Sequence, residues 1–246
     1  LHYLSDPRLD VTTMYVNNHY YQQEVYLSAA HELALFKWWD LNLATDLQYN
    51  TLAADLVNFV YPSRLTALTA LATTFRFGKA TVQGSLLYTF VKDFAREPGA
   101  EAGEKNVFTP TLVAQYKPFR ETDFALRAFY KRIFRMPTLN DLYYTFIGNK
   151  YLKPEYTTQY NLGIAYTKEW LKVRFRRFEV SLDAYYNEVD DKIIAMPTSN
   201  QFQWTMVNLG YVKIRGADAV VSGSMCFGRF SIDCRATYTW QKAQDF

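Results

Sequence analysis

The feature that most constrains the fold of this chain is an alternation of apolar and polar side chains with a period of two residues. Between Trp39 and Asn50, Trp, Leu and Tyr side chains alternate with Asp, Asn and Gln, and the segment from Phe230 to Gln241 alternates in the same way. A helix would spread these residues around its circumference, whereas a strand separates them onto two faces. The pattern therefore predicts β-strands.

The alternation recurs along the whole chain and gives roughly ten strands with no convincing helix. The predicted strands cover residues 22–36, 39–50, 65–77, 80–91, 108–117, 123–131, 157–167, 178–189, 205–225 and 229–241. After residue 241 the chain is polar, and we expect it to leave the last strand as a loop.

The connections between these strands alternate between short and long. The short ones lie near residues 37–38, 78–79, 118–122 and 227–228, whereas 51–64, 92–107, 132–156 and 190–204 are long. Residues 168–177 are the irregular case, longer than a tight turn needs, and part of this basic run is expected to be strand. This parity is typical of an antiparallel up-and-down transmembrane β-barrel, with turns at one rim and loops at the other. A soluble β-sandwich would show Greek-key crossovers instead.

Composition supports the membrane barrel over a soluble one. Aromatic residues make up 17% of the chain, and no apolar run approaches the length of a membrane helix. Eleven charged or amide side chains share the polar faces of the strands: Asp40, Asp46, Arg127, Lys131, Gln159, Asn161, Glu179, Asp183, Asp218, Asp233 and Arg235. In a barrel these would meet water or a plug domain inside. In a soluble barrel they would face outward solvent, but the opposite face would then expose contiguous bands of large apolar side chains.

The cysteine and charge inventory excludes several classes of site. Cys226 and Cys234 flank a short turn on opposite faces, so no disulfide is expected. Two such thiols and three scattered His residues make no metal site, and no cofactor is predicted. The net charge is only +3, and a turn at a membrane surface explains the basic run at 168–177 better than nucleic acid does.

The longest segment without alternation is Arg132–Glu155, RIFRMPTLNDLYYTFIGNKYLKPE. Its prolines, glycine and asparagines are typical of a loop. Its many aromatic and aliphatic residues are not typical of a solvated loop. We therefore expect a loop that folds back into the barrel or binds a ligand.

This segment resembles a known family signature. Phe134–Tyr143 reads FRMPTLNDLY, Leu152–Glu155 reads LKPE, and Tyr160–Gly163 reads YNLG. Together they resemble the barrel of TonB-dependent outer-membrane receptors, in which FRxPT…LY is followed by LxPE and an aromatic-x-x-Gly strand. The wording is most similar to receptors of the cobalamin and siderophore type.

The resemblance implies a domain organisation, a location and partners. Residues 1–246 would be part of a twenty-two-stranded barrel in the outer membrane of a Gram-negative cell. The plug domain and some strands would be absent from this chain. Such a receptor binds a scarce, large nutrient outside the cell and imports it when the TonB–ExbB–ExbD complex pulls on the plug. Outer-membrane lipid and a surface lipoprotein are further candidate partners. Cobalamin or another corrinoid is the first choice of ligand, and a ferric siderophore is the second.

Candidate site residues lie in two long connections. Broad apolar faces with polar handles suit a large ligand, and the predicted ligand-binding residues are Tyr143, Tyr144, Phe146, Asn149, Phe202 and Trp204. The motif residues predicted to be structural are Arg135, Pro137, Asn140, Leu142, Pro154 and Glu155. We expect Arg135 and Glu155 to fix the feet of the loop, through a buried charged pair or a set of loop hydrogen bonds.

Two other classes of function remain as alternatives. A non-transporting surface binder or adhesin would use the loops alone. An outer-membrane protease would need a carboxylate–histidine site, for which His2 and His19 near Asp6 and Asp10 are the inventory. A phospholipase-type pair would need Ser28 within reach of His31. No nucleotide-binding or hydrolase motif occurs in the sequence, so we predict no enzymatic activity.

The parity of the connections makes a topology prediction. Cysteines placed at Asn58, Glu101 or Ser199 should react with an impermeant thiol reagent on whole cells, because these positions lie in long connections. Cysteines at Lys79 or Glu121 should stay unlabelled. Labelling of Lys79→Cys from outside would invert the orientation.

Overall fold

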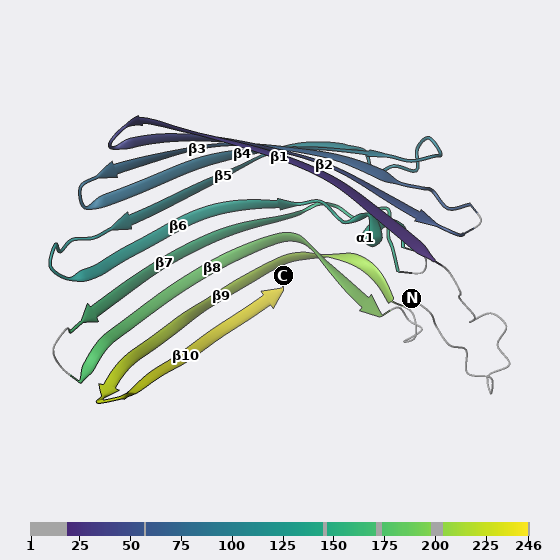
Figure 1. Ribbon diagram of the computed structural model, residues 1–246. Helices are drawn as coiled ribbons and strands as arrows, with labels where there is room; N and C mark the ends of the chain where they lie inside the picture. The colour runs from purple at the N-terminus through teal and green to yellow at the C-terminus, as the bar shows by residue number, and fades with distance from the viewer. Residues whose placement is uncertain (1–18, 57, 145–146, 171–173, 198–203, 246) are drawn as a thin grey trace, which may run out of the picture.

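The computed structural model describes residues 19–56, 58–144, 147–170, 174–197 and 204–245, which form one antiparallel sheet (Figure 1). Its ten strands hydrogen-bond in sequence order from β1 to β10. They are β1 (Tyr20–Phe36), β2 (Trp39–Ala54), β3 (Ser63–Phe77), β4 (Ala80–Phe94), β5 (Glu104–Tyr116), β6 (Asp123–Arg135), β7 (Glu155–Glu169), β8 (Phe175–Pro197), β9 (Trp204–Phe227) and β10 (Phe230–Asp245).

The predicted up-and-down meander is confirmed, since each strand pairs with its neighbour in the chain. Within the described residues the sheet is open, because β1 and β10 each pair on one side only. The expectation of a loop after residue 241 is wrong, because β10 runs to Asp245, which lies opposite Val212 of β9. The polar residues there stay extended because β9 supplies a ladder partner for each of them, and such pairing overrides weak β-propensity.

The two rims of the sheet differ as the sequence predicted. Tight turns at Gly78 and Gly228, both with positive φ, lie at one rim. This rim is called the turn rim below. The long connections lie at the other rim, together with a short helix, α1 (Leu139–Tyr143) (Figure 1). This rim is called the mouth below. Between β7 and β8, the strands extend to Glu169 and from Phe175, so part of the basic run is strand, as expected.

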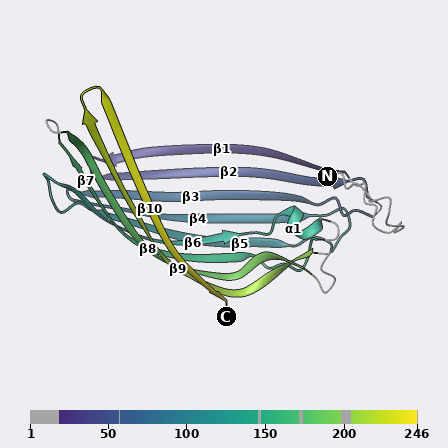
Figure 2. The same ribbon diagram turned by 90° about the horizontal axis from the view of Figure 1, so that it is seen from below.

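The register places all eleven predicted polar side chains on one face of the sheet. Arg127, Gly163, Asp183 and Asp218 lie opposite one another on β6 to β9, and the other members fall on the same side by alternation. Figures 1 and 2 show α1 on the concave side of the curved sheet, and its Leu142 packs on Ile193, which shares the face of Asp183. The polar face is therefore the inner face.

Gly163 explains how charges pair across this inner face. The Asp183 carboxylate reaches over β7 to Arg127 on β6, with Arg127 Nη2 to Asp183 Oδ2 at 3.0 Å. A Cβ on Gly163 would collide with the carboxylate oxygen of Asp183. Because β7, the strand between the two partners, has no side chain at position 163, the ion pair can form directly above its backbone. The glycine of the YNLG motif thus leaves room for this ion pair.

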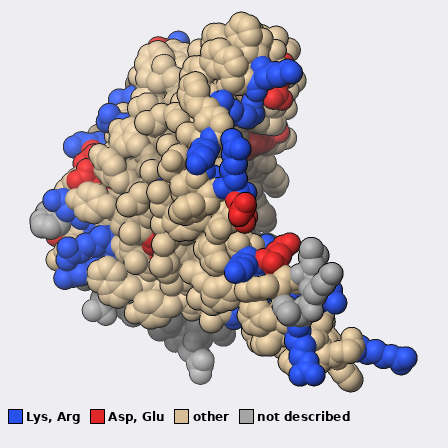
Figure 3. Space-filling model, turned by 90° about the vertical axis from the view of Figure 1, so that its left-hand side faces the viewer, with Lys and Arg blue, Asp and Glu red and all other residues tan. Residues whose placement is uncertain are grey.

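The outer face is apolar and bears an aromatic cluster near the turn rim. Phe36, Trp38, Trp39, Phe75 and Phe77 stack on one another across β1 to β3, with ring centroids 5.5–6.3 Å apart. Figure 3, seen from the turn rim, shows clusters of charge separated by a broad uncharged surface.

Cys226 lies opposite Ser231, so Cys226 and Cys234 are on opposite faces, and both are free thiols. None of the described helices is long and apolar enough to cross a membrane.

The two faces should respond differently to a charge. Leu162→Arg or Leu182→Arg, on the outer face, should lower the free energy of unfolding by about 2–4 kcal/mol at the midplane of a bilayer. Asn161→Arg and Ser181→Arg, on the inner face, should have a much smaller effect, because those side chains meet polar surroundings. Urea titration of the receptor in lipid vesicles measures both. Equal losses on the two faces would indicate a packed soluble core.

Candidate functional site

The candidate site is built around residues 136–154, which connect β6 to β7 and are called the inner loop below. Its short helix α1 begins after Thr138, whose hydroxyl accepts from Asp141 N at 3.1 Å while Asp141 accepts from Thr138 N at 2.9 Å. This reciprocal capping stabilises one turn of helix. The prediction of no helix is wrong here because α1 is too short to show a helical period. The Thr-x-x-Asp spacing was the signal that could have revealed it.

A buried ion pair holds the start of the inner loop against the wall of the sheet. Arg64 on β3 donates to both carboxylate oxygens of Asp93 on β4, at 2.6 and 2.7 Å. The same guanidinium donates to the backbone oxygen of Pro137 at 2.5 Å. Arg64 and Asp93 are 6% and 3% exposed, so the charges are compensated by each other and by the loop backbone. The three groups fix where the loop enters the inner face.

An apolar contact holds the middle of the loop. Leu142 on α1 and Leu152 near the end of the loop pack on Ile193 of β8, and all three are buried. Tyr143 packs against this cluster and donates its hydroxyl to Ala100 O at 3.1 Å, in the connection between β4 and β5. Burial raises the pKa of the Tyr143 hydroxyl above its usual value, which keeps it a neutral donor. The expectation that this loop folds back inside is confirmed.

Backbone and amide groups hold the second half of the loop against β9. Asn149 donates its side-chain amide to Met206 O at 2.9 Å, and Met206 N donates to Ile147 O at 2.9 Å. Asn208 on β9 donates to Lys153 O and accepts from Lys153 N, at 3.0 and 2.8 Å. The loop is therefore tied to both sides of the curved sheet.

A group of four aromatic rings lies beside the loop at the mouth, and only one of them, Tyr144, was predicted from the sequence. Tyr144 of the inner loop stacks on Tyr20 of β1, with ring centroids 4.4 Å apart. Tyr20 also meets Phe59 edge-on, and Phe59 meets Tyr61 in the same way. These four residues, Tyr20, Phe59, Tyr61 and Tyr144, are called the mouth rings below. Tyr61 has a φ of 47°, a strained backbone for a bulky residue, and such strain is concentrated at functional sites.

The predicted feet of the loop bond different partners. Arg135 and Glu155 lie opposite each other in the register of β6 and β7. Arg135 is paired instead with Asp141 of α1, at 3.7 Å, and its side chain is half exposed. Glu155 accepts from the buried backbone N–H of Ile193 at 3.0 Å. Of the two arrangements expected, the structure shows the loop hydrogen bonds and not a buried pair of these two residues.

The remaining predicted residues divide by location. Among the motif residues Pro137 and Leu142 are buried, Pro154 is half-buried, and Asn140 is exposed, with its amide 3.5 Å from Gln22. Among the ligand-binding candidates, Tyr143 and Asn149 hold the loop in place, Tyr144 joins the mouth rings, and Trp204 is 48% exposed at the start of β9. Phe146 and Phe202 lie outside the described residues.

The described residues do not form the phospholipase-type pair, and of the four protease candidates they include His19 alone. His19 bonds Asp55, whose pKa is lowered by the backbone N–H and the ring of His19, at 2.7 and 2.8 Å. Ser28 donates to Asp46 on the inner face, whereas His31 lies opposite Leu43 on the outer face, so the two do not pair. His2, Asp6 and Asp10 lie outside the described residues. No group of His, Cys, Asp or Glu within the described residues could hold a metal ion.

An antiparallel meander with an apolar, aromatic outer face, a charged inner face and an inward-folded loop is typical of the wall of an outer-membrane β-barrel. Comparison with known proteins specifies the family. Residues 3–246 match the family described as "TonB dependent receptor-like, beta-barrel", and the chain belongs to that family. Barrels of this family are Gram-negative outer-membrane proteins that serve as transport receptors.

Three proteins similar to this chain are transporters of different substrates. The chain is 31% identical over 112 residues to the "Vitamin B12 transporter BtuB" of Vibrio vulnificus (strain YJ016), covering 46% of this chain and 16% of that protein. It superposes on the FrpB iron transporter of Neisseria meningitidis (F3-3 variant) with a TM-score of 0.68 at 14% identity, covering 93% of this chain and 36% of that one. For the "Copper transporter OprC" the TM-score is 0.71 at 16% identity, covering 92% and 38%.

The vitamin B12 transporter is similar in sequence, whereas the iron and copper transporters are similar mainly in structure. The structural neighbours are too distant in sequence to show more than the fold. The chain spans well under half the length of each of these three proteins.

The feet of the loop should differ in their contribution to stability. Glu155→Ala leaves the Ile193 N–H without its acceptor in a site that is 7% exposed, so we expect a loss of about 1–3 kcal/mol in the free energy of unfolding. Arg135→Ala removes a half-exposed contact and should cost less than about 1 kcal/mol. Urea titration in vesicles tests this, with Glu155→Gln, which keeps an acceptor, as the control. Equal losses for Glu155→Ala and Arg135→Ala would contradict the assignment.

Proposed function

We propose that this chain is the barrel part of a receptor that binds a large, scarce nutrient at its mouth and imports it with energy supplied by TonB. Cobalamin or another corrinoid is the favoured ligand, and a ferric siderophore is the second candidate. The observation that carries the choice of ligand is the 31% identity to a vitamin B12 transporter, which extends over 46% of this chain.

The mouth rings support a large ligand with extended apolar surface. Tyr20, Phe59, Tyr61 and Tyr144 come from β1, the β2–β3 connection and the inner loop, so they form one surface from distant segments. Tyr61 is 40% exposed, and the Arg96 guanidinium lies 5.6 Å from its ring centroid. Aromatic faces beside a cation and several hydroxyls suit a bulky ligand that also carries amide or carboxylate groups.

The inner loop connects ligand contact to the interior of the barrel. Tyr144 stacks on Tyr20 of the mouth rings, while Pro137, seven residues earlier on the same loop, is held by the buried Arg64–Asp93 pair. A ligand that displaces Tyr144 would therefore pull directly on a tethered segment of the inner face. The energy for import would come from the TonB–ExbB–ExbD complex acting on a plug domain, with a surface lipoprotein as a further partner at the mouth.

Binding and uptake on cells test this proposal. In a strain lacking its own cobalamin receptor, the complete receptor should bind labelled cyanocobalamin and restore growth that requires it, in a TonB-dependent way. The double variant Tyr20→Ala/Tyr144→Ala should weaken binding per assembled receptor by about 2 kcal/mol, roughly thirty-fold, if these rings are a hot spot. Tyr116→Ala, at the turn rim, is the matched control and should bind normally.

The outcomes separate the competing functions. Binding of a ferric siderophore in place of cobalamin would move the receptor to the second ligand class. Binding of either nutrient without TonB-dependent uptake would favour a non-transporting surface binder. Normal binding by Tyr20→Ala/Tyr144→Ala would place the ligand site elsewhere at the mouth.

A further inference from the structure

The outer face changes from apolar to basic at one level across β9 and β10. From the turn rim toward the mouth, the outward positions of β9 are Phe227, Met225, Gly223, Val221, Ala219 and Ala217, followed by Arg215 and Lys213. Those of β10 are Phe230, Ile232, Cys234, Ala236, Tyr238 and Trp240, followed by Lys242. An apolar band that ends in basic residues marks the edge of the hydrocarbon layer.

Tyrosines on the neighbouring strands continue this row of the register. Tyr130, Tyr160 and Tyr186 lie opposite one another on β6, β7 and β8, with successive ring centroids 5.3 and 6.3 Å apart. Tyr186 in turn lies opposite Arg215. Tyrosines on the outward faces of barrel strands gather at the membrane–water interface. Arg215 and Lys242 therefore sit where lipid headgroups begin on the mouth side.

Arg215 and Lys242 form an unfavourable pair as they stand. They are direct partners in the β9–β10 register, and both are exposed. Like charges directly opposite each other destabilise a sheet. In the part of the chain that the structure describes, neither side chain forms an ion pair, and Lys213 adds a third cation two residues from Arg215. Two outward carboxylates of β8 lie beside Lys213 rather than beside the Arg215–Lys242 pair: Glu188 is the register partner of Lys213 and accepts from Tyr186 at 3.0 Å, and Asp190 lies opposite Tyr211. An anion between Arg215 and Lys242 would remove their repulsion.

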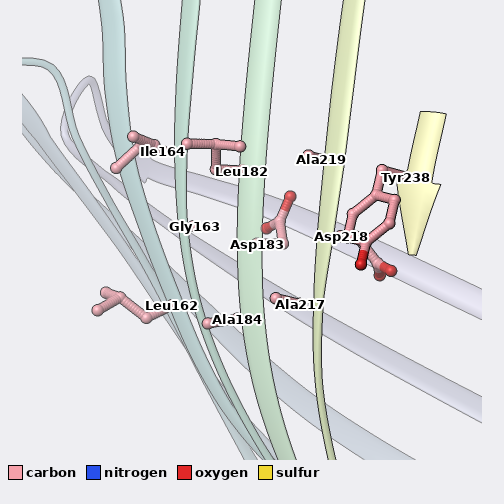
Figure 4. A pocket seen from close by; sticks show the side chains of 10 residues that line it. All are labelled: Leu162, Gly163, Ile164, Leu182, Asp183, Ala184, Ala217, Asp218, Ala219 and Tyr238. Carbon is pink, nitrogen blue, oxygen red and sulfur yellow. The ribbon is translucent and has the colours of Figure 1, made fainter. Parts of the chain in front are cut away.

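A hollow in the outer face lies immediately below these cations. It spans β7 to β10 and has a volume of about 340 Å³ (Figure 4). Small side chains form its floor, Ala184, Ala217 and Ala219, and the larger Leu162, Leu182 and Tyr238 surround them. Ala217 follows Arg215 by two residues, so the floor begins at the next outward position of β9. A second hollow, of about 260 Å³ around Gly223, Cys234 and Ala236, continues toward the turn rim.

We propose that this strip of the outer face binds a phosphorylated lipid of the extracellular leaflet. The phosphate lies between Arg215 and Lys242, with Lys213 beside it, and an acyl chain occupies the hollow over Ala184, Ala217 and Ala219. A phosphate oxygen accepts charge-assisted hydrogen bonds from both cations, which offsets their repulsion. The lipid is the favoured occupant because it alone combines an anion at the interface with a chain at hydrocarbon depth. A free anion would leave the hollow unfilled.

Lipid binding to the purified complete receptor tests the proposal. The probe is bisphosphorylated lipid A, titrated in detergent and counted by native mass spectrometry, with the same lipid lacking its phosphates as the comparison. Arg215→Gln/Lys242→Gln should bind lipid A at least tenfold more weakly than the wild type. Lys37→Gln/Arg229→Gln, which removes the same charge from two exposed turns at the turn rim, is the matched control and should bind normally.

Two further variants separate the phosphate from the chain. Arg215→Lys/Lys242→Arg keeps both cations and should retain lipid A binding. Ala217→Leu/Ala219→Leu fills the hollow and should weaken binding of the lipid with and without phosphates by a similar factor. Equal lipid A binding by the wild type and Arg215→Gln/Lys242→Gln would overturn the proposal. If that variant does not assemble, the wild type decides, since equal binding of the two lipids would also overturn it.

Discussion

Everything in this structure depends on the need to pair backbone hydrogen-bonding groups away from water. Hydrocarbon offers no partners for N–H and C=O groups, so a chain that crosses it with strands must pair every strand with its neighbours. Here ten strands pair in sequence order without a crossover. The meander in turn fixes two faces and two rims. The alternation of side chains then follows from lipid on one face and polar surroundings on the other.

The inner face shows how a polar interior is made stable. Arg127 and Asp183 pair across the bare backbone at Gly163, and Arg64 and Asp93 pair beneath the inner loop. The second pair also holds Pro137, so one buried salt bridge serves both the wall and the loop. Removing one partner of such a pair leaves an uncompensated buried charge, which costs far more than losing a surface ion pair. The loop position therefore depends on residues far from it in the sequence.

The mouth and the outer surface use aromatic residues in different ways. At the mouth, rings from distant segments stack to form one partly exposed surface beside the tethered loop. On the outer face, tyrosines mark the interface, and the basic residues of β9 and β10 continue that level. The same side chains can serve both purposes because each has an apolar body and a polar tip.

The sequence by itself determined the strands, their order, the two faces and the family. The physical reason is that period-two patterning and turn spacing are local, and the FRMPT…LY, LKPE and YNLG segments are contiguous. It did not reveal α1, which is too short for a helical period, or the extension of β10, which depends on partners in β9. Only the tertiary structure paired Arg64 with Asp93 and stacked Tyr20 on Tyr144. It also showed that Arg135 pairs with Asp141 and not with Glu155. Those contacts join residues from separate strands and loops, and their geometry is set by how the sheet curves rather than by any local pattern.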